Sequence, residues 1–149
     1  MAKSICLLFT GLLCGITAVP VSGAGGGGDR EETLNQAIES LNSCVRGYPD
    51  KKLVLTAVSQ QTRVPKKTLL SQMNDTHLSY GELLTANSLV EGSGKNLNEV
   101  LAMKKGKGWA GLSIELGIDP NSIVNRLRTA EQTVRAAQAG KSGASLDQE

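Results

Sequence analysis

The chain has 149 residues, with 16 lysine and arginine residues against 14 aspartate and glutamate residues, and a net charge of +2. This length suits one domain, and the near-neutral charge favours neither a nucleic-acid-binding protein nor one that binds anionic membranes. The single histidine excludes metal sites built from several histidines, such as a three-histidine zinc centre.

The start of the chain, over residues 1–24, has the layout of a secretory signal peptide. Lys3 supplies a positive charge, Ile5–Ile16 is an uncharged and mostly apolar run, and Pro20 then interrupts any helix before the small residues that end at Ala24. A membrane-spanning helix needs about 20 apolar residues, so this run is too short to cross a bilayer comfortably. We expect cleavage after Ala24 or Gly23 and a periplasmic or secreted protein with no membrane span; an uncleaved anchor is the alternative.

Cleavage of the signal peptide also changes the cysteine count. It removes Cys6 and Cys14, so Cys44 is the only remaining thiol and no intramolecular disulfide can form. We interpret Cys44 as a small apolar residue on a helix face. The functional alternative is an intermolecular disulfide, which an oxidising compartment permits.

The apolar residues between positions 31 and 139 follow a helical spacing. One stripe near the start and one near the end recur every three or four residues: Leu34, Ile38, Leu41 and Val45, then Ile123, Leu127, Ala130, Val134 and Ala137. Sustained alternation of β-branched residues is missing from the sequence, so it predicts no sheet. The expected fold class is all-α.

Capping residues and prolines mark where the helices begin. Ser79 with Glu82, and Asn96 with Glu99, have the spacing of reciprocal capping boxes, and Pro65 suits the first turn of a helix. The pattern predicts a small bundle of about seven short helices, over residues 31–45, 50–62, 65–74, 79–91, 96–105, 109–116 and 120–138. Several of them are too short to be stable alone, so they must form together by burying their apolar stripes.

The chain divides into four segments on this basis. Residues 1–24 are the signal peptide, residues 25–30 a glycine-rich tether, residues 31–139 the helical domain and residues 140–149 a disordered tail.

A weak internal repeat runs through the middle of the chain. Tyr80 and Trp109 are each followed by a small residue and, three positions after the ring, by Leu83 or Leu112. Repetition of a helix, a turn and a second helix is typical of a duplicated helical module. We therefore expect a duplicated unit that resembles a helix-turn-helix.

Six short motifs between Leu53 and Ile118 carry a resemblance to known proteins. They are Val64-Pro65, Tyr80-Gly81-Glu82, Gly94-Lys95, Glu99-Val100, Gly106-Lys-Gly-Trp109 and Leu116-Gly117-Ile118. This stretch resembles small exported bacterial proteins of uncharacterised function, in which a Gly-aromatic-Gly motif opens a helix twice. The chain departs from that motif at Ser79 and Ala110, where glycine is usual. The resemblance implies an all-helical fold and a location in the bacterial envelope, and it implies no catalytic residue.

The segment from Val100 to Leu127 also resembles a DNA-binding helix-turn-helix in its apolar and glycine spacing. Its second helix would begin at Asp119-Pro120 and present Asn125, Arg126 and Arg128 to base edges. The near-neutral charge, the acid at the helix start and the signal peptide all disfavour nucleic-acid binding.

Motifs for catalysis or cofactor binding are incomplete. His77 and Asp75 could together orient one proton or hold one metal ion, but neither a nucleophile motif nor a third ligand accompanies them. The segment Gly106–Gly111 matches the G-x-G-x-x-G sequence of dinucleotide-binding loops. That motif functions only after a β-strand, and here a predicted helix precedes it. We therefore predict no catalytic residue, no metal ion and no cofactor.

The best hypothesis is a non-enzymatic exported module that binds another envelope protein or a second copy of itself. The expected interaction surface is formed by Lys104, Lys105, Lys107 and Trp109. The alternative for Trp109 is a core position, since the chain has few large side chains, and the lysines alternatively form a solvated helix end. The alternative functions are a small-molecule or metal carrier or enzyme with a site between helices, and the nucleic-acid binder described above.

Overall fold

The computed structural model describes residues 26–48 and 50–143, and within them every regular element is an α-helix. The helices are α1 (Gly26–Arg46), α2 (Lys51–Thr62), α3 (Lys66–Thr76), α4 (Tyr80–Ser93), α5 (Leu97–Lys104), α6 (Trp109–Glu115) and α7 (Pro120–Gly143). The predicted all-α class and the seven helices are confirmed. The signal peptide predicted over residues 1–24 and the end of the predicted tail, residues 144–149, lie outside the described residues.

Two helices are longer than the sequence pattern predicts. Residues 26–30, expected as part of a tether, form the first turn of α1, and residues 140–143, expected as part of a disordered tail, extend α7. Glycine disfavours helix by about 1 kcal/mol relative to alanine, so a glycine run is an unreliable helix boundary when the adjoining segment is already helical. Thr33 Oγ1 supports the early start of α1 by donating to the Asp29 carbonyl oxygen at 2.7 Å.

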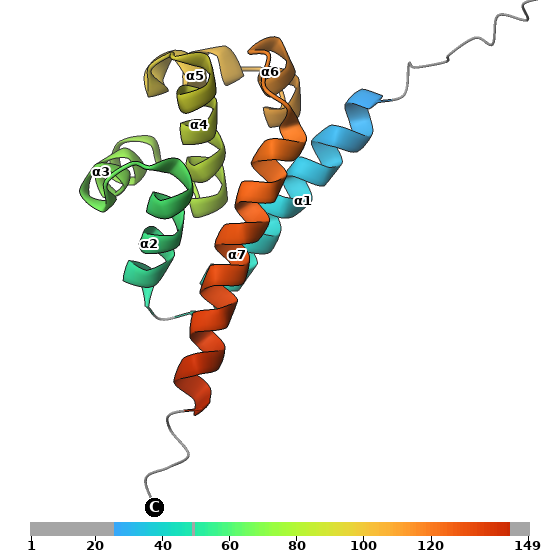
Figure 1. Cartoon of the computed structure of the whole chain (residues 1–149). Helices are drawn as coiled ribbons and strands as arrows, with labels where there is room; N and C mark the ends of the chain where they lie inside the picture. Colours follow the sequence, from blue (N-terminus) through green and yellow to red (C-terminus); the bar gives the residue numbers. More distant parts are fainter. Residues whose placement is uncertain (1–25, 49, 144–149) are drawn as a thin grey trace, which may run out of the picture.

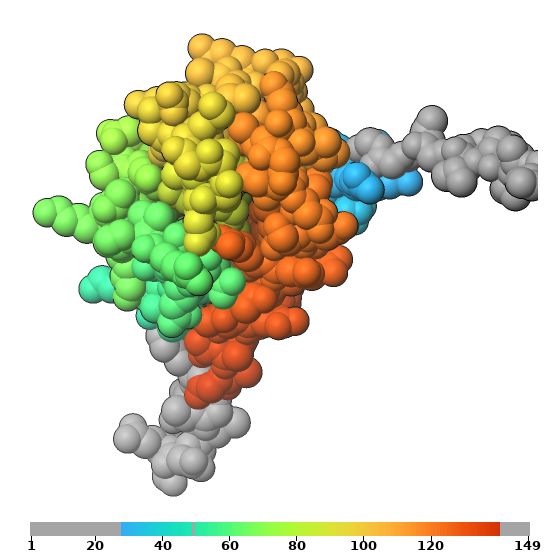
Figure 2. Space-filling view, turned by 45° about the horizontal axis from the view of Figure 1, so that its top comes forward, coloured from blue at the N-terminus to red at the C-terminus, as the bar shows by residue number. Residues whose placement is uncertain are grey.

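The two longest helices lie side by side and form the centre of the fold (Figure 1). In the same view α2 to α5 gather on one side of α7, and the start of α1 and the end of α7 extend in different directions. Figure 2 shows α7 running along one face of the molecule, next to the segments of α2 to α5, with only the start of α1 visible. Both ends of the described chain therefore project from a body in which the first and last helices are packed together.

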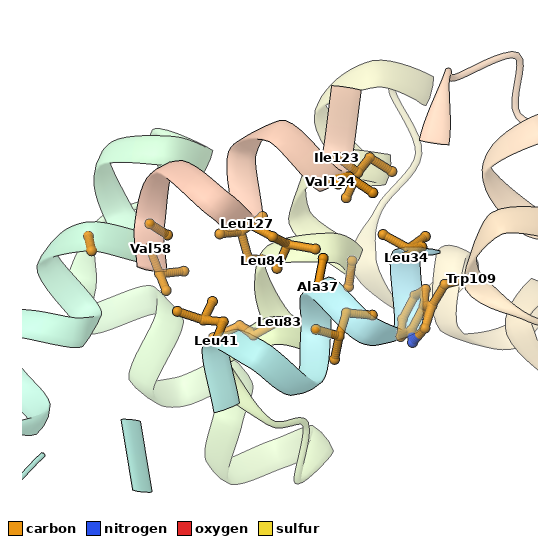
Figure 3. Close-up of a cluster of buried hydrophobic side chains, with 14 of the residues drawn as sticks. Leu34, Ala37, Leu41, Val58, Leu83, Leu84, Trp109, Ile123, Val124 and Leu127 are labelled. Atoms are coloured by element: carbon orange, nitrogen blue, oxygen red, sulfur yellow. The ribbon is translucent and has the colours of Figure 1, made fainter. Parts of the chain in front are cut away.

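The apolar stripes predicted on α1 and α7 form the core. Figure 3 shows Leu34, Ala37 and Leu41 of α1 among side chains of α4, α6 and α7. The stripe residues of α1 are 0 to 8% exposed, and those of α7 from Ile123 to Val134 are fully buried. Complete burial of a leucine or isoleucine side chain contributes about 1.5–3 kcal/mol, so these stripes account for much of the association of the short helices.

The two predicted capping boxes are confirmed. Ser79 and Glu82 exchange side-chain and backbone hydrogen bonds at the start of α4, and Asn96 and Glu99 do the same at the start of α5. Pro65 lies one position earlier than predicted: it is the cap residue that precedes α3 and not a residue of its first turn. An extended residue at this position suits proline, which has no N–H to donate.

Candidate functional site

Helix α1 holds the starts of both ring-bearing helices. The Glu31 carboxylate accepts hydrogen bonds from the Trp109 and Ala110 N–H groups of α6, at 3.0 and 2.7 Å. Asn42 accepts from the Gly81 N–H of α4 at 3.0 Å. The first N–H groups of a helix have no partner within the helix, and a carboxylate there also complements the helix dipole. The repeated aromatic motif thus marks two helix starts that dock on one helix, each through a separate polar side chain of α1.

Glycine at position 81 allows the close contact between α1 and α4. A Cβ atom at Gly81 would lie 2.8 Å from the Ile38 carbonyl oxygen and 3.0 Å from the Ile38 Cα of α1. These are backbone atoms, so no side-chain rotation relieves the contact. Helices α1 and α4 can therefore approach this closely only while position 81 lacks a side chain.

A cleft of about 690 Å³ opens beside these contacts, and we call it the α1 cleft. One wall is formed by side chains of α1: Asn35, Ile38, Glu39, Asn42, Val45 and Arg46. The remainder is formed by the segment that enters α2 and by the starts of α4 and α6: Tyr48, Lys51, Ser79, Tyr80, Glu82 and Trp109. Its volume lies in the range of ligand pockets, and more than half of its lining residues are polar or charged.

The α1 cleft carries opposite charges close together at its mouth. Arg46 Nη2 lies 3.4 Å from Glu39 Oε2 and donates a hydrogen bond to Ser43 Oγ at 2.9 Å. The side chains of Arg46 and Glu39 are 71% and 66% exposed, so their ion pair contributes little to stability. Burial raises the pKa of the Tyr80 hydroxyl above its ordinary value of 10.0, so this group stays neutral near pH 7.

The lysine surface expected from the sequence forms only in part. Trp109 is 3% exposed, so the core alternative holds for its ring, which packs near Leu34 in Figure 3. Lys104 Nζ lies 4.6 Å from the centre of that ring, and Lys107 Nζ lies 2.5 Å from Glu115 Oε2. The three lysines lie around a turn at Gly106, but two of them already interact with neighbouring side chains.

Cys44 lies in the contact between α1 and α7 and is 9% exposed. Burial raises the pKa of its thiol above the ordinary value of 9.0. Gln138 Nε2 of α7 lies 3.9 Å from the sulfur. These observations agree with a small apolar helix-face residue and disfavour the intermolecular disulfide, which requires a sulfur that a second chain can reach.

The other candidate residues are not brought together into a site. His77 ends α3 with a φ of 56°, and both His77 and Asp75 are exposed. The described residues contain no group of three His, Cys, Asp or Glu side chains placed to hold a metal ion. Among the described helices, none has both the length and the apolar character needed to cross a bilayer.

One of the three residues proposed to contact DNA bases, Arg126, is held by contacts within the fold. Arg126 of α7 donates to the Gln61 carbonyl oxygen at 3.3 Å and pairs with the Glu91 carboxylate, which also pairs with Arg63 at 3.5 Å. This guanidinium therefore links α7 to the end of α2 and to α4. Asn125 and Arg128 are both exposed on α7.

Comparison with known proteins identifies no relative. No family model matches the sequence, no curated protein matches it significantly, and no solved structure matches its fold significantly.

Proposed function

We propose that the protein is a non-enzymatic, exported interaction module of the bacterial envelope that binds a partner protein through the α1 cleft. The observation that carries this proposal is the cleft itself, which a buried core and two capped helix starts hold in shape. A site held by rigid helices presents its polar groups with little loss of conformational entropy on binding. Export is supported by Lys3 and by the short apolar run that ends before Pro20.

The α1 cleft is preferred over the lysine turn as the binding surface. Trp109 is buried beneath Lys104, and Lys107 is paired with Glu115, so the turn offers little apolar surface to a partner. Protein interfaces gain most of their affinity from aromatic and arginine side chains in partly enclosed positions, and the cleft supplies Tyr80 and Arg46.

Affinity capture from an envelope fraction tests the surface. The bait is the full-length protein, and the cleft variant carries Asn35→Arg and Glu39→Arg, two exposed positions that leave the core intact. The control variant carries Gln36→Arg and Glu32→Arg, exposed neighbours on α1 that do not line the cleft. We expect the wild type and the control to retain the same partner and the cleft variant to lose it. Equal retention by all three proteins would exclude the cleft as the binding surface.

Export is tested separately with a reporter. A phosphatase that is active only outside the cytosol, fused after Ala24, should become active in a bacterial host. An inactive fusion found in the cytosol would contradict the signal-peptide hypothesis.

The cleft also supports a second candidate function, a small-molecule carrier, because a volume of about 690 Å³ suits a metabolite-sized ligand. Native mass spectrometry of the protein purified from its source distinguishes the two functions. A carrier retains a stoichiometric small molecule, whereas the interaction module shows the mass of the chain alone.

A further inference from the structure

We infer that the α1 cleft binds a short extended segment at the carboxyl terminus of the partner protein. The inference rests on the proposed function and specifies the chemistry of the partner. It follows from the length of a polar row on α1, from the positive charges at one end of that row, and from the apolar surface beside them.

The polar row sets the length of the bound segment. Asn35, Glu39, Asn42 and Arg46 follow one another at intervals of four, three and four positions, so they share one face of α1. At a helical rise of about 1.5 Å per residue, this row spans about 16 Å, which an extended peptide covers in about five residues at roughly 3.3 Å each. The Asn42 amide already bonds Ser79 and Gly81, whereas the exposed Asn35 amide can both donate and accept, as the backbone of an extended peptide requires.

The positive charges set the direction of the peptide. Arg46 and Lys51 line the same end of the cleft, where the chain passes from α1 into α2. A guanidinium matches a carboxylate in geometry and forms its strongest hydrogen bonds with one. Arg46 is 71% exposed, so its pair with Glu39 contributes little, whereas a ligand carboxylate at this end of the cleft could contact both Arg46 and Lys51.

The apolar residues beside Arg46 favour a peptide that ends in a free carboxyl group over a peptide with an acidic side chain within its sequence. Val45 and Tyr48, which line the cleft beside Arg46, are 8% and 9% exposed, so each offers only a narrow apolar edge to a ligand. A terminal residue carries its carboxylate and its side chain on the same Cα atom, so an apolar side chain can contact this surface while the carboxylate reaches Arg46. An aspartate or glutamate side chain within a peptide carries the negative charge, but it has no apolar group that could contact this surface.

The chain contains one tryptophan, and it lines the cleft. The emission of Trp109 is therefore a direct readout of binding. The probe is a pool of N-acetylated pentapeptides that end in leucine with a free carboxyl group and are randomised at the other four positions. The comparison pool is identical except that its carboxyl group is amidated.

Peptides retained by the full-length protein in equilibrium dialysis are identified by mass spectrometry and then titrated singly against Trp109 emission. We expect retention from the free-acid pool and not from the amidated pool. A variant with Arg46→Gln and Lys51→Gln should bind the retained peptides about tenfold more weakly or worse, the loss expected when hydrogen bonds to a charged group are removed. A charge-matched control with Arg30→Gln and Lys52→Gln, both exposed and outside the cleft, should bind as the wild type does.

Three outcomes overturn the inference: no peptide retained from either pool, equal retention from both pools, or equal binding by the cleft variant and the control. Circular dichroism melting shows that each variant is folded, which is expected because all four substituted side chains are exposed. If no peptide binds as expected but capture of the envelope partner is still lost when Asn35 and Glu39 are replaced, the proposed function stands. Only the inferred chemistry of the partner is then wrong. If both experiments fail, the cleft is not a binding site for proteins.

Discussion

The close packing of α4 on α1 at Gly81 predicts a large effect from a single methyl group. In a Gly81→Ala variant the new Cβ atom would lie 2.8 Å from the Ile38 carbonyl oxygen and 3.0 Å from both Ile38 Cα and Ile38 Cγ2. Only Cγ2 can turn aside, so α4 must move away from α1. That movement also lengthens the hydrogen bond from the Gly81 N–H to Asn42 Oδ1, which measures 3.0 Å.

The expected magnitude follows from three opposing contributions. Overpacking in a tight core costs about 1–3 kcal/mol, and two backbone contacts place this site at the upper end. Weakening the hydrogen bond costs about 1 kcal/mol, whereas alanine gains about 1 kcal/mol over glycine within a helix. The free energy of unfolding should therefore fall by about 2–3 kcal/mol, the sum of these values.

Urea unfolding followed by circular dichroism measures this change, with Gly111→Ala as the matched control. Gly111 is exposed in α6, and a Cβ atom there meets nothing within 4 Å. This substitution should raise the free energy of unfolding by about 0.5–1 kcal/mol through helix propensity alone. If Gly81→Ala were as stable as Gly111→Ala, α4 would not pack on α1 at this position and the wall of the α1 cleft would be wrongly placed.

Three further predictions concern the core and the cap of α6. Glu31→Ala removes a carboxylate that accepts two short hydrogen bonds from α6, so chemical denaturation should show a loss of about 1–2 kcal/mol, and Glu32→Ala at the exposed neighbouring position should show almost none. Trp109→Ala empties a buried site and should lower the free energy of unfolding by about 3 kcal/mol or more, whereas unchanged melting would refute the core position. Burial raises the pKa of the Cys44 thiol, so its contribution to stability is complete below pH 9.0 and is lost as pH rises through the higher folded pKa. Maleimide labelling of this thiol should accordingly be slow in the native protein and fast in urea, and rapid native labelling would contradict its burial.

The helices could be predicted because their signals are local. The capping boxes at Ser79 and Asn96 place the starts of α4 and α5 within four-residue windows, and the stripe from Leu34 to Val45 identifies the buried face of α1. The early start of α1 was missed because glycine has a low helix propensity, which the adjoining helix overrides here.

The cleft could not be predicted because its walls come from distant parts of the chain. Asn42 meets Gly81 across 39 positions and Glu31 meets Ala110 across 79, and no local pattern records such a contact. The repeated aromatic motif was the sequence signal for the contacts of α1 with α4 and α6. A small residue beside an aromatic residue at a helix start indicates that another helix packs closely there. The sequence left Trp109 as either part of the lysine surface or a core residue. Its burial places the ring in the core, where a large aromatic side chain fills space among few others.

Chemical-shift mapping tests most directly whether the α1 cleft is the surface that the protein uses. The ¹⁵N-labelled protein is titrated with the unlabelled partner recovered from the envelope fraction. The proposal predicts that the largest changes fall on residues that line the cleft: the Asn35 side-chain amide, the Trp109 indole N–H and the backbone N–H groups of Ser79, Tyr80 and Glu82. Changes confined to the lysine turn at residues 104–107, with the cleft signals unmoved, would contradict it.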